Sequence, residues 1–293
     1  MATKVTKRLE AVAGFLFIAP NLLGFIVFIA YPLIASLLIS FTDWSLLTPP
    51  VGAGLRNYAD LRIDTHFWIS LRNTVVFTFT SVPLRIIIAL FLAVLLNQKI
   101  RAIGFFRTVY FLPVVCSMVS IAMMWQWLLE YNTGLINYML SWAGIERIRW
   151  LSSTQWAMAS VVMVAVWSST GYNMVIFLAA LQGVPRELLE AARIDGANNW
   201  KTFWHVTFPC ISPATYFVTV TSIIGSFQVF DVTTVLTAGG PGLATNTLVM
   251  LIYQNAFQNF RMGYASAIAY VLFGFIFVLT VQQNILSKKW MHY

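Results

Sequence analysis

Residues 185–213 read Pro185-Arg-Glu-Leu-Leu-Glu-Ala-Ala-Arg-Ile-Asp-Gly-Ala-Asn-Asn-Trp-Lys-Thr-Phe-Trp-His-Val-Thr-Phe-Pro-Cys-Ile-Ser-Pro213. They form the only long polar, helix-compatible stretch in a chain that otherwise consists mostly of apolar runs of membrane length. Charged side chains are costly inside the hydrocarbon of a bilayer. We therefore expect this stretch to lie in water and to meet another molecule there.

The composition indicates the environment of the remaining residues. The chain has 59% hydrophobic and 10% charged residues and a mean hydropathy of +0.76, whereas soluble proteins have about 45–50% and about 25%. The net charge of +8 could suggest nucleic-acid binding, but such proteins gather their basic residues on one patch. Here Lys and Arg are scattered between apolar runs, which predicts an integral membrane protein with no nucleic-acid partner.

Six apolar stretches reach the roughly 20 residues that a membrane-spanning helix needs. They cover residues 12–40, 69–96, 109–129, 156–183, 214–236 and 263–286. The predicted fold class is all-α, a polytopic membrane protein with six transmembrane helices. We divide it into an amino-terminal segment, a first span with an outer loop, a core of five spans and a tail, at residues 1–10, 11–68, 69–286 and 287–293.

The first apolar run is too long to be a secretory signal. It continues from about residue 11 to 41, well beyond the 7–15 apolar residues of a signal peptide, so we expect an uncleaved first span. Three prolines fall inside the first two spans, where neighbouring groups can satisfy the freed carbonyls. They predict kinks rather than helix ends: Pro20, Pro32 and Pro83.

Lys and Arg beside the spans predict the orientation. With the amino terminus inside, eleven basic residues lie on the cytoplasmic side and six outside, and Arg85 is the eighteenth. Both termini and residues 185–213 are thus expected in the cytoplasm, with the protein in the plasma (inner) membrane. The outer segments are expected at residues 42–68, 130–155 and 237–262; the first is loop-like, and the third opens with a loop at Gly239-Gly240-Pro241-Gly242. We interpret Trp142 and Trp150 as interfacial anchors rather than ligand contacts.

No sequence motif indicates catalysis. The chain lacks the Gly-rich G-x-x-x-x-G-K-[ST] loop that cradles phosphates, and its three histidines have no metal-ligand spacing. Cys116 and Cys210 are far apart and indicate neither a disulfide framework nor a metal cluster. We predict no catalytic residue, no metal site and no enzymatic activity in this chain.

Polar residues at membrane depth are the informative ones, because they are expensive there. Arg85 lies near the centre of the second span, two residues after Pro83. One interpretation is a structural arginine that binds carbonyls freed by the proline. The other is a contact to a polar or anionic substrate or to a partner helix, and the sequence favours neither.

Two further spans carry polar clusters. In the fourth, Ser169 and Asn173 are four residues apart and share a helical face, with Tyr172 beside them. In the fifth, Phe227 and Asp231 are also four apart, and Gln228 is adjacent. Such groups suit the lining of a path for a hydrophilic solute, although polar residues also link spans to one another. Because two spans carry a cluster, we favour substrate contact.

The stretch 185–213 is predicted to form two short helices. Pro185 suits a first helical position, Leu188, Leu189 and Ala192 form an apolar stripe, and Gly196 ends or bends the helix. Asp195 lies near the carboxyl end, where the helix dipole disfavours an acid, so we expect it to cap the next segment or to contact a partner.

The second helix presents Trp200, Phe203, Trp204 and Thr207 on one face, and Pro209 is expected to stop it. We interpret the pair as a docking surface. The alternative, a helix on the membrane surface, predicts more basic residues than Lys201.

These residues also carry a family resemblance. The stretch Glu190-Ala-Ala-Arg-Ile-Asp-Gly-Ala197, with Phe203 and Pro209 downstream, resembles the EAA signature of the membrane subunits of binding-protein-dependent ABC importers. The flanking residues resemble the carbohydrate-uptake group, which includes maltose-type and glycerol-phosphate-type permeases. They are Ala180-Leu-Gln-Gly-Val-Pro185, Gly239-Gly-Pro241 with Thr245, and Phe105-Phe-Arg-Thr-Val-Tyr-Phe-Leu-Pro113.

The resemblance implies a type I importer permease that pairs with a homologous second permease, two ATP-binding cassette subunits and an extracytoplasmic solute-binding protein. It implies that ATP and Mg²⁺ bind to the ATPase subunits, with no cofactor in this chain. Contacts to the ATPase would be made by Glu190, Ala191, Ala192, Asp195, Gly196 and Ala197. Sugar contacts would fall on Ser168, Ser169, Tyr172, Phe227 and Gln228, and the polar clusters add Asn173, Asp231 and Arg85 as candidates.

The leading hypothesis is therefore a permease subunit that moves a mono- or oligosaccharide into the cell by alternating access. A glycerol phosphoester is the alternative substrate, because Arg85 could meet a phosphate. A self-sufficient secondary transporter is a less favoured alternative, since such proteins keep ionisable residues within their spans.

Overall fold

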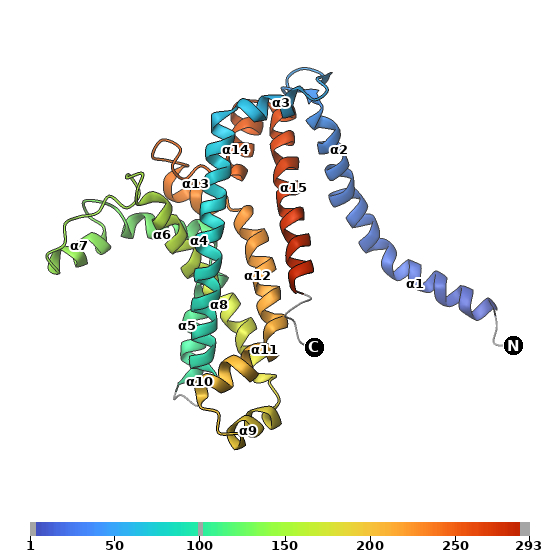
Figure 1. The fold of residues 1–293 in the computed structure, drawn as a ribbon. Helices are drawn as coiled ribbons and strands as arrows, with labels where there is room; N and C mark the ends of the chain where they lie inside the picture. Colours follow the sequence, from blue (N-terminus) through green and yellow to red (C-terminus); the bar gives the residue numbers. More distant parts are fainter. Residues whose placement is uncertain (1–3, 99–101, 288–293) are drawn as a thin grey trace. The chain divides into compact units, whose positions relative to one another are not determined.

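The structure is a computed structural model that describes residues 4–98 and 102–287 (Figure 1). The predicted all-α membrane fold is confirmed. Four described helices are long and apolar enough to cross a membrane by themselves, and two bent helix pairs bring the number to six if each pair is one span. The chain divides into two compact units, residues 1–63 with 252–270 and residues 64–251 with 271–293. Part of the predicted tail, residues 288–293, and the basic residues at 99, 101, 288 and 289 lie outside the described residues.

The first unit contains the first span, which is helical throughout. It runs through α1 (Lys4–Phe25), the π-helical turn η1 (Ile26–Ala30) and α2 (Tyr31–Ser40). Pro20 lies inside α1 and Pro32 in the first turn of α2, so neither ends the span, as predicted. The apolar side chains along the span are exposed within this unit, as expected for a surface that meets hydrocarbon or another helix.

The segment 42–68 is more ordered than the predicted loop. It forms an antiparallel hairpin of β1 (Thr42–Asp43) and β2 (Val51–Gly52), followed by α3 (Arg56–Ile63). The buried Asn57 amide donates to the Ser40 and Thr42 carbonyls, at 2.8 and 2.9 Å. This side chain satisfies backbone groups that the end of α2 leaves open, which the turn residues alone did not reveal.

The second unit contains the remaining core helices. They are α4 (Thr65–Leu96), α5 (Ile103–Val115), α6 (Met118–Leu128), α7 (Leu135–Trp142), α8 (Ala157–Gln182), α9 (Arg186–Ile194), α10 (Asn199–Thr202), η2 (Phe203–Thr207), α11 (Phe208–Cys210), α12 (Ser212–Phe227) and α13 (Asp231–Thr237). Three more elements follow in the sequence. The boundary between the two units falls within α14 (Leu248–Tyr253) and within α15 (Met262–Ser287), and η3 (Gln254–Gln258) belongs to the first unit.

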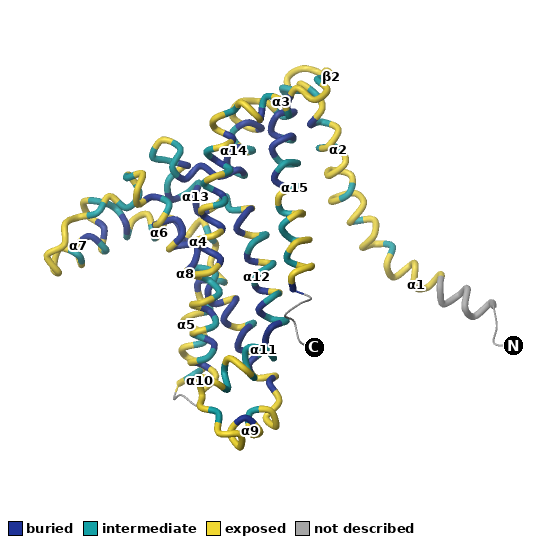
Figure 2. The backbone as a smooth tube through the Cα atoms, in the orientation of Figure 1, coloured by how far each residue is buried: buried dark blue, intermediate teal, exposed yellow. Residues whose placement is uncertain are grey.

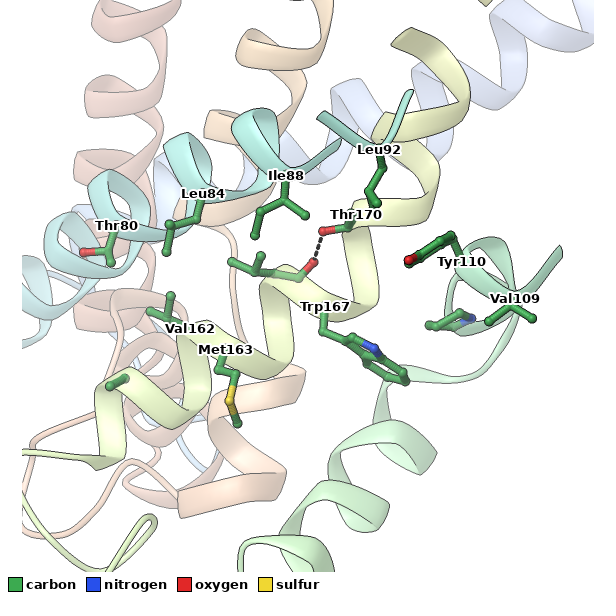
Figure 3. A pocket seen from close by; sticks show the side chains of 13 residues that line it. Thr80, Leu84, Ile88, Leu92, Val109, Tyr110, Val162, Met163, Trp167 and Thr170 are labelled. Atoms are coloured by element: carbon green, nitrogen blue, oxygen red, sulfur yellow. Dashed lines mark hydrogen bonds between the residues drawn. The ribbon is translucent and has the colours of Figure 1, made fainter. Parts of the chain in front are cut away.

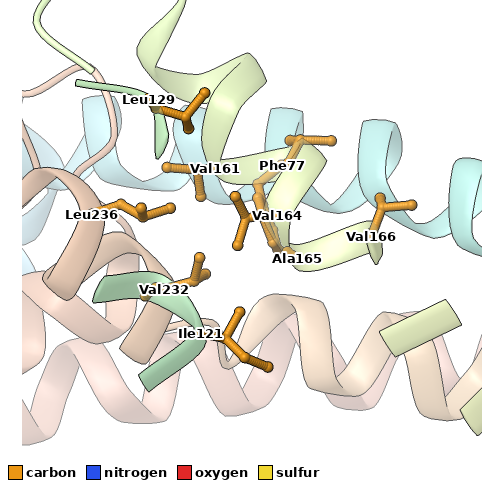
Figure 4. Packing of buried hydrophobic residues seen from close by; sticks show 11 residues of the cluster. Phe77, Ile121, Leu129, Val161, Val164, Ala165, Val166, Val232 and Leu236 are labelled. Atoms are coloured by element: carbon orange, nitrogen blue, oxygen red, sulfur yellow. The ribbon is translucent and has the colours of Figure 1, made fainter. Parts of the chain in front are cut away.

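Helix α8 lies at the centre of this unit, and Figure 2 shows it buried over much of its length. Two buried clusters surround it. The first joins α8 to α4, α6 and α13 around Phe77, Val164 and Leu236 (Figure 4). The second, which we call the inner cluster, joins it to α4 and α12 around Ala89, Phe177 and Val218. In a bilayer such clusters are held by close van der Waals packing, because lipid tails are as apolar as the side chains.

Two of the predicted spans are broken. The predicted span 109–129 is the pair α5 and α6, bent by 101°, because Cys116 and Ser117 are extended between them. The predicted span 214–236 ends with α12 at Phe227, and α13 begins at Asp231. An acidic residue is favourable at a helix amino terminus, so Asp231 suits a new helix better than a helix interior. Pro83 does not end a helix, because α4 continues through it.

Side chains from distant segments satisfy the backbone at the second break. Thr247 Oγ1 donates to the Val229 carbonyl at 3.0 Å. Asn73 of α4 donates to the carbonyls of Leu243 and Asn246, in the loop after Gly242. Backbone groups without water need such internal partners, so the irregular segments are stabilised by α4. The outer segments 130–155 and 237–262 contain helical elements, namely α7, α14 and η3.

The packing of α5 on α8 requires Gly171. A Cβ atom at this position would overlap the Tyr110 carbonyl oxygen and would lie 3.0 Å from the Phe111 Cα. Both contacts are with backbone atoms, which cannot rotate away. The two helices therefore touch through their backbones at this point.

We predict that Gly171→Ala destabilises the protein. Overpacking costs about 1–3 kcal/mol, which outweighs the gain of at most about 1 kcal/mol in helix propensity. Thermal unfolding in detergent measures the effect. Gly225→Ala in α12 is the matched control, because nothing lies within 4 Å of a Cβ there; equal melting temperatures for the two variants would refute the close contact.

Candidate functional site

Residues 185–213, which we call the helical loop, contain the first candidate site. Helix α9 begins at Arg186, one residue later than predicted. Pro185 is the residue just before the helix and not its first residue. The helix ends as predicted, because Gly196 adopts a left-handed conformation with φ +76°. The Gly196 and Ala197 N–H groups then donate to the carbonyls of Arg193 and Ala192. This is the usual glycine-terminated helix end.

Helix α9 has one anchored and one exposed face. Ala192 is buried, and Leu189 packs against the inner cluster. Glu190, Ala191 and Asp195 are exposed, together with Gly196. Five of the six residues predicted to contact an ATPase therefore remain at least partly accessible, Ala197 among them, whereas Ala192 faces the chain's own core and positions the others.

Asp195 does not cap the next helix. That cap is Asn198, whose side chain accepts a hydrogen bond from the Lys201 N–H at 2.8 Å. The exposed Asp195 carboxylate remains available for a partner, which is the other predicted role. An asparagine before a helix is an equally strong sequence signal for a cap, so this assignment could have been made from the sequence.

The second helical stretch continues past Pro209, contrary to prediction. It passes from α10 through η2 into α11, and Pro209 lies in the first turn of α11. The wider π turn shifts the hydrogen-bond register, so the missing N–H of proline is not needed there. Trp200 is 70% exposed, and its ring packs edge-on against Trp204 at 5.7 Å. An exposed aromatic pair next to α9 supports the predicted docking surface.

The polar cluster in α8 is divided by the structure. Asn173 is buried, at 4% exposed, whereas Tyr172 is 49% exposed. Ser168 and Ser169 are half-buried, and both hydroxyls donate to the Ala165 carbonyl, at 3.1 and 2.8 Å. Their acceptor lone pairs remain open to a ligand, but Asn173 and Tyr172 do not lie on one accessible face.

The cluster at the end of α12 also differs from the prediction. Phe227 is 2% exposed, while Gln228 and Asp231 are exposed. Phe227 and Asp231 do not share a helical face, because α12 ends at Phe227 and α13 begins at Asp231. The accessible groups here are the Gln228 amide and the Asp231 carboxylate at the start of α13.

Arg85 belongs to this second cluster. Its guanidinium donates to the Ser226 hydroxyl at 3.4 Å and lies 5.8 Å from the Phe77 ring. Ser81, one turn earlier on α4, is 3.5 Å from the same hydroxyl. Arg85 thus joins α4 to α12 and does not use a carbonyl freed by Pro83. The sequence did not single out Ser81, whose only signal was the four-residue spacing to Arg85, nor Ser226, although Ser226 begins the polar stretch of the fifth span that ends at Asp231.

An apolar groove of about 580 Å³ lies between α4, α5 and α8 (Figure 3). Leu84, Ile88, Met163 and Trp167 line it, and the Thr170 hydroxyl is occupied by the Val166 carbonyl at 2.6 Å. None of the predicted substrate residues lines this groove. Its chemistry suits hydrocarbon or another helix better than a hydrophilic solute.

Residues 73–292 match the model of one protein family, described as the binding-protein-dependent transport system inner membrane component. The chain is 38% identical over 290 residues to the lactose transport system permease protein of Rhizobium radiobacter, covering 97% of this chain and 96% of the relative. It is 37% identical over 281 residues to the arabinooligosaccharides transport system permease protein of Halalkalibacterium halodurans, covering 95% and 88%.

A solved structure has a similar fold. It is a bacterial ABC transporter involved in the import of the acidic polysaccharide alginate, and one of its chains superposes with a TM-score of 0.85. The match covers 98% of this chain and 99% of that chain at 22% sequence identity. At this identity the similarity concerns the fold.

We predict that Gly196→Ala loosens the helical loop. A side chain in the left-handed region costs about 1–2 kcal/mol, and no atom lies within 4 Å of the added Cβ, so the effect is conformational rather than steric. Hydrogen exchange of residues 186–203 should accelerate. Gly104→Ala, which adds a Cβ in open space without a positive φ, should leave exchange in the helical loop unchanged; unchanged exchange in both variants would contradict the role of Gly196.

Proposed function

The chain belongs to the family of binding-protein-dependent transport system inner membrane components, and from this premise we propose that it is a sugar-translocating permease subunit of an ATP-driven importer. Relatives named for lactose and arabinooligosaccharide transport support a mono- or oligosaccharide as the substrate. The chain carries no catalytic residue in this proposal, because ATP hydrolysis is performed by separate subunits.

The proposed assembly contains this chain, a homologous second permease, two ATP-binding cassette subunits and an extracytoplasmic solute-binding protein. It lies in the lipid of the plasma (inner) membrane with both termini of this chain in the cytoplasm. ATP and Mg²⁺ bind to the ATPase subunits. One solved alginate transporter forms a complex with a periplasmic protein that holds an alginate pentasaccharide, which supports the binding-protein partner.

The two-faced helix α9 is the observation that carries the proposal. Its exposed face offers the Glu190 carboxylate, Ala191 and the Asp195 carboxylate, while Leu189 and Ala192 hold the opposite face on the core. Arg186 and Arg193 are exposed as well, so α9 presents small residues among charges of both signs on a rigid support, which suits a docking helix. A helix that lay on anionic lipid would instead present mainly basic residues.

The inner cluster provides the route from α9 to the spans. It contains Leu181 of α8 and Val184, which precede α9, Ile211 near the end of the helical loop, and Val218 of α12 beyond it. Ala89 and Ala93 of α4 complete it. Protein interiors are close-packed and resist compression, so a displacement of α9 by an ATPase moves the inner ends of these spans together. This movement is the proposed basis of alternating access.

A neutral sugar fits the polar groups better than a glycerol phosphoester does. Arg85 lies near the centre of a predicted span, and its guanidinium is already bonded to Ser226 and lies beside the Phe77 ring. Gln228 offers a neutral amide that both donates and accepts, which matches sugar hydroxyls. The phosphoester remains the alternative substrate, and Arg85 variants separate the two.

Ion-coupled secondary transport is less well supported. It requires ionisable groups placed within spans, and the two candidates are Arg85 and Asp231. Arg85 is partnered by a neutral hydroxyl, and Asp231 is exposed at the start of α13. Ion-coupled transport would also give the helical loop no role.

Uptake by proteoliposomes tests the function. Complexes of this chain with its second permease, ATPase and binding protein should accumulate at least one labelled sugar from a panel of lactose, maltose and an arabinooligosaccharide, only with ATP inside. The chain reconstituted alone should accumulate none. Uptake by the chain alone, driven by an ion gradient without ATP, would overturn the importer assignment.

We predict that Glu190→Arg uncouples transport from ATP hydrolysis. Loss of a coupling free energy of about 1–3 kcal/mol lowers sugar uptake and binding-protein-stimulated ATPase activity by about 5- to 150-fold. Glu146→Arg, a charge reversal of an exposed glutamate in the outer segment, should leave both rates unchanged. Equal effects of the two variants, in complexes that assemble fully, would exclude the proposed role of α9.

We predict that Arg85→Gln retains sugar uptake within about threefold, since a neutral sugar does not need the guanidinium charge and the glutamine amide can still donate to the Ser226 hydroxyl, which leaves a loss at the low end of the about 0.5–1.5 kcal/mol of one hydrogen bond. If the substrate were a glycerol phosphoester, loss of a charge-assisted bond of about 1.5–3 kcal/mol would raise KM by about 10- to 150-fold. Uptake of labelled sugar and of glycerol 3-phosphate measures both. Arg72→Gln, at the exposed outer part of α4, is the control for a general loss of charge.

A further inference from the structure

A second hollow, which we call the outer pocket, lies at the opposite end of the second unit from the helical loop. Its volume is about 420 Å³, within the range of about 300–1,000 Å³ that is usual for small-molecule sites. The end of α6, the segment after it and the end of α13 enclose it. The buried Leu129 and Leu236 of the first cluster contribute to its lining.

The aromatic walls of the outer pocket are held in place by Asn137. This side chain is 1% exposed and makes four hydrogen bonds. It donates to the carbonyls of Tyr131 and Ile148, and it accepts from the Ile148 N–H and from the Trp150 indole N–H, at 3.0–3.1 Å. One buried amide thus fixes both the Tyr131 backbone and the Trp150 ring, so the pocket is organised before any ligand arrives.

The charged residues beside the pocket are engaged elsewhere. The Glu130 carboxylate accepts hydrogen bonds from the N–H groups of Asn132 and Thr133 and from the Thr133 hydroxyl. These bonds, foremost that from the Thr133 backbone, hold the pKa of the Glu130 carboxyl below its usual value. The Arg149 guanidinium lies 5.2 Å from the centre of the Tyr131 ring. Neither charge is directed to an anionic or cationic ligand.

The groups that remain are neutral. Within residues 102–287, the side chains of Gln126 and Ser152 make no hydrogen bond to another residue, and both line the pocket. An amide and a hydroxyl each donate and accept, as sugar hydroxyls require. Tyr131 and Trp150 also line the pocket; the Trp150 ring meets Trp156 only edge-on, and aromatic rings are flat apolar surfaces of the kind against which the C–H faces of a pyranose pack. This combination fits a neutral sugar ring better than a phosphate or a peptide carboxylate.

The position of the pocket relates it to the polar cluster. Thr237 and Ala238 at the end of α13 line the pocket, and Asp231 begins the same helix next to Gln228. Seven helical residues span about 10 Å, which is close to the length of a disaccharide. A ligand in the outer pocket would therefore lie one short helix away from the groups proposed to contact the sugar.

We propose that the outer pocket is a first, weak binding site for a neutral sugar ring, occupied before the sugar reaches the polar cluster between α4, α12 and α13. The proposal rests on the proposed function for the class of solute. It assigns ligand contact to Trp150, which the sequence indicated as an interfacial anchor, and to Gln126 and Ser152.

Protection of a cysteine tests this site in the assembled transporter in nanodiscs. The native Cys116 and Cys210 are replaced by Ser, and Ser152→Cys provides the reporter. Labelling by a methanethiosulfonate reagent should slow about threefold or more in lactose or maltose at about 100 mM, a concentration that fills a millimolar site. Mannitol, a linear polyol without a ring face, should give no protection. Thr154→Cys, exposed and outside the pocket, should react equally fast in all solutions.

Two side-chain variants separate binding from a change of shape. In the Ser152→Cys background, Gln126→Ala should raise the half-protecting sugar concentration about threefold to tenfold, the effect of one lost hydrogen bond. Gln155→Ala, an exposed glutamine outside the pocket, should leave it unchanged. The proposal would be overturned if mannitol protected Ser152→Cys as well as the sugars do, or if neither the sugars nor mannitol protected it. It would also be overturned if only added binding protein without sugar protected the cysteine, because this result would assign the surface to protein docking.

The same preparations keep this inference distinct from the proposed function. Sugar uptake without protection of Ser152→Cys by the accumulated sugar would refute the outer site and leave the importer in place. Protection by lactose or maltose in a complex that accumulates no sugar of the panel would support the site and overturn the proposed function.

Discussion

The whole structure depends on the need to satisfy backbone hydrogen bonds where no water is available. Continuous helices meet this need by themselves, and α4, α8 and α15 follow it without interruption. The irregular segments meet it only through side chains of other elements. Thr247 serves the Val229 carbonyl in the gap between α12 and α13, and Asn73 serves two carbonyls of the segment after Gly242. These few polar residues make the interrupted helices possible.

The long helices could be predicted from the sequence, because hydropathy reports which residues tolerate hydrocarbon. The helical loop was equally visible, since Pro185 and Gly196 mark helix boundaries through their backbone preferences. The breaks were not visible. Residues 109–129 are as apolar on both sides of Cys116 as an unbroken span would be, and hydropathy carries no information on direction. The partner of Val229 lies 18 residues away in sequence, beyond any local pattern.

The candidate site shows the same division. Polarity singled out two segments, around Ser169 and around Gln228, because polar groups at membrane depth are costly. Helical spacing then misassigned their geometry, since it assumed that Phe227 and Asp231 share one helix. The sequence did not predict the role of Asn137, whose side-chain amide makes four hydrogen bonds within the outer segment. Its importance comes from burial, which a single asparagine in a polar segment does not reveal.

The contact at Gly171 has a consequence for movement. Two helices that touch through side chains can slide, because rotamers adjust as they pass. No side chain lies between Gly171 and the Tyr110 carbonyl. Sliding would therefore separate the two helices, whereas rotation about this point preserves their contact. Gly171 is thus a pivot. The end of α8 at Gln182 lies eleven residues from it, which is about 16 Å along the helix axis. A tilt of a few degrees there shifts the root of the helical loop by only about an ångström, so coupling through α8 works by small rotations.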